Sequence, residues 1–93
     1  MANNAQKKLR IQVAIHAFAY EVMNDPLISD DKFDQLALLI DVNIPTDRGD
    51  LDTWFKEMYD PSTGAWIYNH PEYARIGILY QSCANYRGRI NAK

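Results

Sequence analysis

The stretch IHAFAYEVMNDPLISDDKFDQL, residues 15–36, combines the end of one helix, a sharp corner and the start of a second helix. Asp25-Pro26 ends the first helix, because proline has no N–H to donate and disfavours the helical conformation in the residue before it. Ser29 can cap the second helix with its hydroxyl, and Asp30-Asp31 follow where the helix dipole favours negative charge. The stretch therefore predicts a helix-turn-helix hairpin at the N-terminal end of the fold.

A longer residue pattern runs through this hairpin. It reads Tyr20-x-x-x-x-Asp25-Pro26-x-Ile28-Ser29-Asp30-x-x-Phe33-Asp34-x-Leu36, preceded by His16. This pattern resembles the N-terminal Ia domain of bacterial NAD+-dependent DNA ligases, and the resemblance covers about residues 1–42. In those ligases the small helical domain closes over the nicotinamide mononucleotide half of NAD+. The resemblance therefore implies a helical pair that binds nicotinamide mononucleotide or NAD+.

The resemblance also implies which residues form that nucleotide site. They are His16, Tyr20, Glu21, Asp30, Phe33 and Asp34. Tyr20, Asp30 and Asp34 keep the residue types of the family. Glu21 stands where the family has a histidine, and its carboxylate would repel a phosphate. Phe33 replaces a tyrosine and lacks the hydroxyl that could form a hydrogen bond.

Two of these residues also have structural interpretations. Asp34 can brace the corner or pair with Lys32 or Arg10 instead of contacting a ligand. His16 lies in an apolar stretch, where a histidine is commonly a hydrogen-bonded interior group. Both interpretations stay open at the level of sequence.

Hydrophobic periodicity predicts four helices in the chain. They span about residues 4–23, 30–42, 50–59 and 71–87. Two apolar stripes on the first helix predict a central helix that is packed on more than one side. Leu38 and Leu39 widen the apolar face of the second helix, so we expect that helix to be well covered too.

The second half of the chain carries most of the aromatic residues. The third helix has a one-sided apolar face, and its members are Leu51, Trp54, Phe55, Met58 and Tyr59. Residues 65–68 form a stretch too short to classify, and it could be extended. In the fourth helix, Gly77 would allow close approach of another helix, Cys83 would be buried in the core, and Gly88 would end the helix.

Composition supports one globular domain. Hydrophobic residues make up 47% of the 93 residues and aromatic residues 12%, which argues against disorder. We expect a single all-α domain, a compact bundle of about four helices, with a ligase-like pair in residues 1–42 and two further helices in 43–93. The sequence has no run of about 20 apolar residues and no signal-peptide pattern, and the single cysteine suits a reducing compartment. A cytoplasmic protein without membrane contact is the expectation.

The net charge of −2 hides an uneven distribution. Residues 1–20 carry three basic side chains and no acid, whereas residues 21–60 carry eleven acids against three bases. An acidic centre repels phosphate, which argues against direct nucleic-acid binding. The acids can form a partner-binding face, or they can simply be solvated at helix starts and loops.

The sequence holds no motif for catalysis or metal binding. A ligase needs a lysine in a Lys-x-Asp-Gly motif, and this motif is absent, as are a glycine-rich phosphate loop and paired cysteine or histidine ligands. We therefore expect a non-catalytic binding module that retains weak binding of nicotinamide mononucleotide or NAD+.

The alternative function is interaction with another protein. A phage or mobile-element accessory protein could present Trp54 or Trp66 to a partner, for example to inhibit a host ligase or a defence complex, because aromatic anchors are favoured in interfaces. A homo-oligomer that buries the aromatic face of the third helix is the remaining possibility.

Overall fold

The computed structural model describes residues 4–91, with side chains from residue 5 to residue 84. Its helices in chain order are α1 (Asn4–Glu21), α2 (Asp30–Leu39), α3 (Gly49–Met58), the short 3₁₀ helix η1 (Ala65–Asn69) and α4 (Tyr73–Asn91). This described range contains no strand, so the predicted all-α bundle of about four helices is confirmed.

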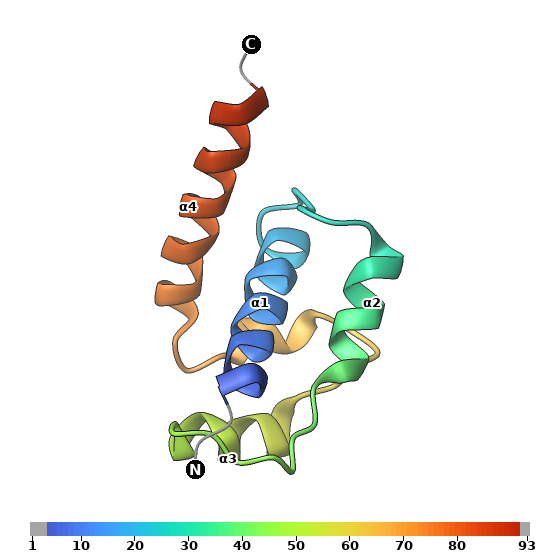
Figure 1. The fold of residues 1–93 in the computed structure, drawn as a ribbon, viewed down its shortest axis with the longest axis vertical. Helices are drawn as coiled ribbons and strands as arrows, with labels where there is room; N and C mark the ends of the chain where they lie inside the picture. Colours follow the sequence, from blue (N-terminus) through green and yellow to red (C-terminus); the bar gives the residue numbers. More distant parts are fainter. Residues whose placement is uncertain (1–3, 92–93) are drawn as a thin grey trace.

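Helix α1 is the centre of the fold. It contacts α2, η1 and α4, and Figure 1 shows it between α2 and α4. Val13, Ala14, Ala17 and Ala19 are completely buried, and the small alanine side chains let neighbouring elements approach closely. The prediction of a central helix that is packed on more than one side is confirmed.

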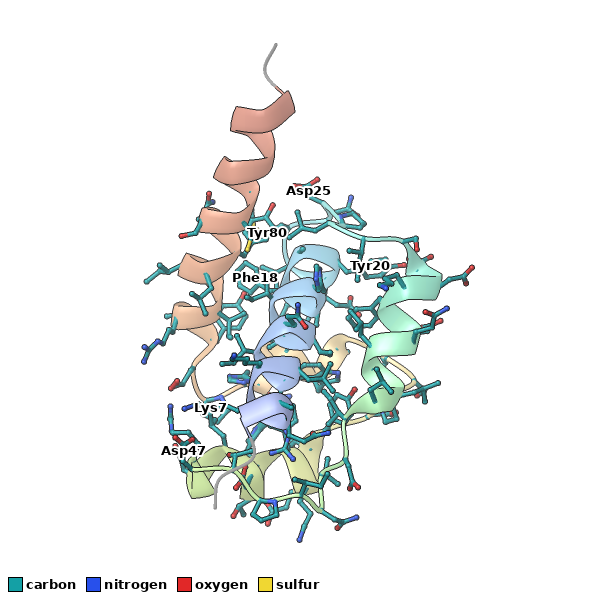
Figure 2. All side chains as sticks on the ribbon, in the orientation of Figure 1. Lys7, Phe18, Tyr20, Asp25, Asp47 and Tyr80 are labelled. Atoms are coloured by element: carbon teal, nitrogen blue, oxygen red, sulfur yellow. The ribbon has the colours of Figure 1, made fainter. Side chains whose placement is uncertain are left out.

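The predicted corner between α1 and α2 has the expected chemistry. The Ser29 hydroxyl accepts a hydrogen bond from the Lys32 N–H at 3.2 Å, as an N-cap does. Asn24 adopts a left-handed conformation, with φ of 49°, which asparagine tolerates better than most residues. Asp25 accepts a hydrogen bond from the Tyr80 hydroxyl at 2.8 Å, so the corner is also tied to α4 (Figure 2).

Several helix ends differ from the predicted ones. α1 ends at Glu21 rather than at Met23, and α2 ends at Leu39 rather than at Val42. α4 continues through Gly88 to Asn91, so the predicted stop at that glycine is wrong. A glycine ends a helix only when it leaves the helical conformation.

Two predictions of burial are wrong. Leu38 and Leu39 are 73% and 62% exposed, because α2 packs against α1 with one side and its other side faces outward (Figure 1). Cys83 is exposed, because α4 runs past the end of α1 and no other element covers that part of the helix in Figure 1. In both cases hydrophobic periodicity predicted the helix correctly, but no neighbouring element in the described part of the chain covers that part of it.

The stretch that the sequence left unclassified is η1. Ile67 is completely buried and Trp66 is 5% exposed, so η1 fills the space beneath α1. Gly64 precedes η1, and a Cβ there would lie 3.2 Å from Glu21 Cγ and 3.6 Å from Ala17 Cβ. The close approach of η1 to α1 therefore depends on this glycine.

Gly77 has the predicted role of a close-contact residue. A Cβ at this position would lie 3.1 Å from Phe18 Cζ of α1. The Phe18 ring lies between Tyr73 and Tyr80 of α4, with ring centroids 5.2 and 5.6 Å away. The contact between α1 and α4 is thus an aromatic side chain packed onto a glycine.

Candidate functional site

The six residues that the ligase resemblance implies lie on neighbouring elements. His16, Tyr20 and Glu21 belong to the C-terminal turns of α1, and Asp30, Phe33 and Asp34 belong to the first turns of α2. Figure 2 shows Tyr20 between the end of α1 and the start of α2. We call this set of six residues the α1–α2 corner.

The polar groups of the corner are available to a ligand. Asp30 and Asp34 are exposed, and neither carboxylate forms a hydrogen bond or an ion pair with any residue that the structure describes. Tyr20 is 46% exposed. Asp34 pairs with neither Lys32 nor Arg10, because Arg10 binds Asp52 instead. The two carboxylates therefore do not brace the corner.

His16 and Glu21 have a more structural character. The His16 side chain is half-buried, burial lowers its pKa, and its Nδ1 is buried without a hydrogen-bond partner among the described residues. It is an interior histidine, but the hydrogen bond that we expected for it is missing. The Glu21 carbonyl accepts a hydrogen bond from the Tyr68 hydroxyl at 2.6 Å, which ties η1 to the end of α1.

The two tryptophans belong to a packed aromatic cluster. Trp54 lies edge-on to Phe55 and Trp66, with ring centroids 5.1 and 6.0 Å apart, and 4.9 Å from the ring of His70. Trp66 also meets Tyr59 edge-on at 5.1 Å. The prediction that Trp66 faces a partner is wrong, because it is buried in this cluster. Trp54 is half-buried, so it is no free aromatic anchor either.

A separate hollow lies between α1, α3 and α4, and we call it the α1–α3–α4 pocket. Its volume is about 360 Å³. The apolar side chains that line it are Ile11, Leu51, Phe55, Ile76 and Leu79. Its polar lining is Lys7, Arg10, Thr46, Arg48, Asp52, His70, Glu72 and Arg75. None of the six corner residues lines it.

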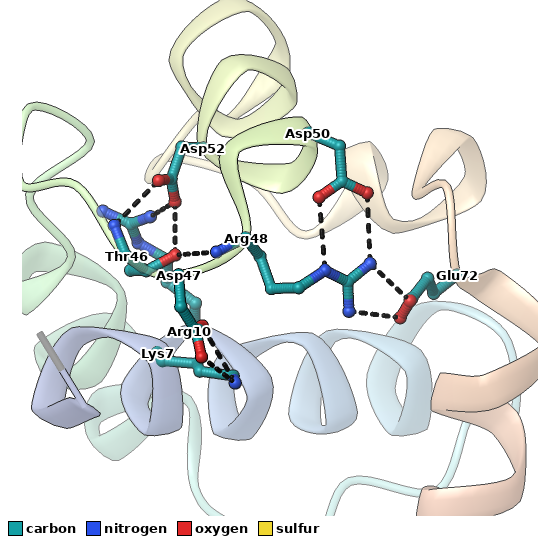
Figure 3. A network of polar contacts seen from close by, with 8 residues as sticks. All are labelled: Lys7, Arg10, Thr46, Asp47, Arg48, Asp50, Asp52 and Glu72. Carbon is teal, nitrogen blue, oxygen red and sulfur yellow. Dashed lines mark hydrogen bonds and ion pairs between the residues drawn. The ribbon is translucent and has the colours of Figure 1, made fainter. Parts of the chain in front are cut away.

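Arg10 is the buried centre of the polar network beside this pocket. Its side chain is 5% exposed, and it binds Asp52 at 2.8 Å (Figure 3). It also donates to the carbonyl oxygens of Asp41 and Ile44, each at 2.7 Å. Asp52 in turn accepts hydrogen bonds from the N–H and hydroxyl of Thr46 at 2.7 and 2.6 Å. One buried cation therefore holds the loop between α2 and α3.

A second group of ion pairs forms the rim of the pocket. Arg48 binds Asp50 at 3.1 Å and Glu72 at 3.0 Å, so it joins the start of α3 to the start of α4. Hydrogen bonds from Arg48 hold the pKa of both carboxyl groups below their usual values. Lys7 binds Asp47 at 3.0 Å across the rim (Figure 3).

His70 lines the same pocket and is 7% exposed. Burial lowers its pKa, so the imidazole is neutral at pH 7. Its Nδ1 accepts a hydrogen bond from the Glu72 N–H at 2.9 Å. The proton of the neutral ring is therefore on Nε2.

Sequence reasoning missed this pocket and its network. The sequence offered one signal, because helical spacing puts Arg10 on the same face as Ala14 and Ala17. In the structure all three residues are buried. A cation on a core-facing stripe indicates a buried ion pair, since an unpaired buried charge is too costly. The identity of its partner, Asp52, is set only by the tertiary fold.

The structure and the comparisons add three observations, about membrane spans, metal ligands and relatives. Within residues 4–91, no helix is both long and apolar enough to cross a membrane. Among the described residues, the His, Cys, Asp and Glu side chains form no group of three that could hold a metal ion. Comparison with protein-family models, with curated proteins and with solved structures finds no match to this chain.

Proposed function

We propose that the protein is a non-catalytic binding module that docks a basic, amphipathic helix of another protein on the outer side of α2. The observation that carries this proposal is the exposure of two adjacent leucines, Leu38 and Leu39, on a helix that is covered on one side only. Large exposed apolar side chains that lie together are typical of interaction surfaces.

Carboxylates lie next to these leucines. Helical spacing puts Asp31, Asp34 and Leu38 on one face, and Leu39 lies beside them. All four side chains are exposed. Asp31 and Asp34 form no ion pair with a described residue, so their charges are free to pair with a partner. We call these four residues the α2 face.

The chemistry of the α2 face suits one class of partner. An amphipathic helix with leucines along one side and lysines or arginines at its edge would bury Leu38 and Leu39 and pair with both carboxylates. The face is too acidic to receive a nucleic-acid backbone. An acidic helix of a second copy would also be repelled.

The test uses a labelled synthetic peptide of about 18 residues, with leucines and lysines at helical spacing. Binding is measured by fluorescence anisotropy and mapped by amide-resolved NMR. We expect shifts along α2, and we expect the double variant L38S/L39S to weaken binding at least about tenfold. I78S is the matched control, because Ile78 is 68% exposed on α4.

Three outcomes would contradict the proposal. The first is an equal loss of binding in I78S. The second is a set of shifts that avoids α2. The third is self-association, measured by sedimentation, that L38S/L39S abolishes, because a second copy would then be the occupant of the α2 face.

A second candidate function is weak binding of nicotinamide mononucleotide or NAD+ at the α1–α2 corner. The unpaired carboxylates of Asp30 and Asp34 in the first turns of α2 and the half-exposed ring of Tyr20 near the end of α1 support it. Carboxylates can accept hydrogen bonds from ribose hydroxyls, and a tyrosine ring can stack on a cationic nicotinamide.

An NMR titration with nicotinamide mononucleotide, and separately with NAD+, tests this candidate. We expect shifts confined to the corner, and we expect them to disappear in D34N. D31N is the matched control, because Asp31 is an exposed carboxylate on the same helix outside the implied site. A silent spectrum, or an equal effect of both variants, would contradict nucleotide binding at the corner.

A further inference from the structure

We infer that the α1–α3–α4 pocket binds a small aromatic monocarboxylate, whose carboxylate pairs with Arg75. No residue of α2 lines the pocket, and helices α2 and α4 lie on opposite sides of α1 (Figure 1). A ligand in the pocket is therefore independent of a partner helix on α2.

The apolar wall of the pocket is part of the core. Phe55 and Ile76 are 2% and 4% exposed, so packing behind them holds their positions. Leu51 and Leu79 extend this wall from α3 and α4. A volume of about 360 Å³ is at the lower end of the range for small-molecule sites. The volume and the apolar wall suit an apolar body of modest size, such as an aromatic ring system.

Arg75 is the cation that is left for a ligand. Lys7, Arg10 and Arg48 also line the pocket, but each already binds at least one carboxylate. The Arg75 side chain is exposed and forms no hydrogen bond or close ion pair with any residue that the structure describes. It acts on Glu72 only through its longer-range charge, and Glu72 is already bound by Arg48.

His70 adds a neutral donor to this charged group. Because its Nδ1 accepts from the Glu72 N–H, its Nε2 carries the proton. No described residue accepts a hydrogen bond from it. A carboxylate has enough acceptor positions to bind a guanidinium and an imidazole N–H at once.

The ligand should carry a single negative charge. Asp52 and Glu72 line the same pocket, and Asp47 and Asp50 lie on its rim as partners of Lys7 and Arg48. Four carboxylates thus balance the four cations. A phosphate dianion would pair with one arginine, and both of its charges would be repelled by these carboxylates. A monocarboxylate would pair with the same arginine and experience about half that repulsion.

The experiment is an amide-resolved NMR titration with 2-naphthoate. Its isosteric amide, naphthalene-2-carboxamide, and the dianion 2-naphthyl phosphate are titrated in parallel. We expect saturable shifts at Leu51, Phe55, Ile76 and Leu79 with the carboxylate, and at least about tenfold weaker binding of both analogues.

Two variants separate the charge of Arg75 from charge in general. R75Q should weaken 2-naphthoate binding at least about tenfold and leave carboxamide binding unchanged. K8Q makes the same change of charge at an exposed residue of α1 that does not line the pocket, and it should bind as the parent does. I11W, at the partly exposed edge of the pocket, should block both ligands.

The opposite results would overturn the inference. They are equal binding of carboxylate and carboxamide, undiminished carboxylate binding by R75Q, or an equal loss in K8Q. Shifts that lie outside the pocket, or the absence of any saturable shift in the well-folded parent protein, would overturn it as well.

Discussion

Arg10 and Asp52 form the ion pair on which the loop between α2 and α3 depends. Arg10 is almost fully buried and its Nε has no hydrogen-bond partner among the described residues, so loss of Asp52 would leave a buried charge with two carbonyl acceptors but no carboxylate partner. We expect D52A to lower the free energy of unfolding by about 3 kcal/mol in urea denaturation. D50A removes an exposed partner of Arg48 and should cost far less. Equal losses would show that burial of Arg10 does not govern the effect.

His70 makes stability depend on pH, because burial lowers its pKa below the ordinary value of 6.5. The unfolded chain then binds a proton more readily than the folded chain, so the free energy of unfolding falls as the pH drops through 6.5. His16 shifts in the same direction. H70Q keeps an acceptor for the Glu72 N–H and should reduce, but not abolish, the difference in urea stability between about pH 7.5 and pH 5.5. An unchanged difference would contradict this origin.

At the scale of elements, Gly77 sets the contact between α1 and α4. G77A gains about 1 kcal/mol of helix propensity, but its methyl group would lie 3.1 Å from Phe18 Cζ, which is a tight contact. The two effects oppose each other, so we expect a stability close to that of the parent. G77V adds further methyl groups against a ring held by two tyrosines, and should cost about 2 kcal/mol in thermal or urea unfolding. G49A is the control, because no atom lies within 4 Å of a Cβ there. A stabilising effect of G77V would mean that Phe18 moves freely.

Local sequence patterns predicted where the α-helices form better than they predicted which sides of the helices are buried. Asp25-Pro26 and the Ser29 cap marked the hairpin. The cap forms as expected, whereas α1 already ends at Glu21, before Asp25-Pro26. The 3₁₀ conformation of η1 was not predictable from five residues, because burial of Trp66 and Ile67 beneath α1 stabilises it. Periodicity likewise could not show that the Leu38 side of α2 lacks a cover. That depends on where α3 and α4 pack.

At the scale of the whole molecule, one candidate site could be predicted from local sequence and the other could not. The α1–α2 corner is made by residues close in sequence, so a local pattern could predict it. The α1–α3–α4 pocket joins Arg10, Asp52, His70 and Arg75, which meet only when the distant helices pack together. Sequence spacing carries no information about such a meeting. The buried Arg10 on a core stripe was the one available signal.

The same arrangement predicts an order of local stability across the molecule. α1 is covered on several sides, whereas α2 rests on α1 and is tied to the second half of the chain by the hydrogen bond from Tyr59 Oη to the Ala37 carbonyl at 2.7 Å. Burial raises the pKa of Tyr59 to about 12, so this phenol remains a donor at neutral pH. We expect amides of α2 to exchange with deuterium faster than those in the centre of α1.

Y59F tests whether that hydrogen bond governs the local opening of α2. Removing the hydroxyl leaves the ring in the aromatic cluster, so exchange in α2 should accelerate while exchange in α4 changes little. Y68F is the matched control, because its hydroxyl donates to Glu21 at the end of α1 instead. Equal acceleration in all helices would mean that α2 opens only with the whole protein. The α2 face would then be as rigid as the core, and docking on it would require no adjustment of α2.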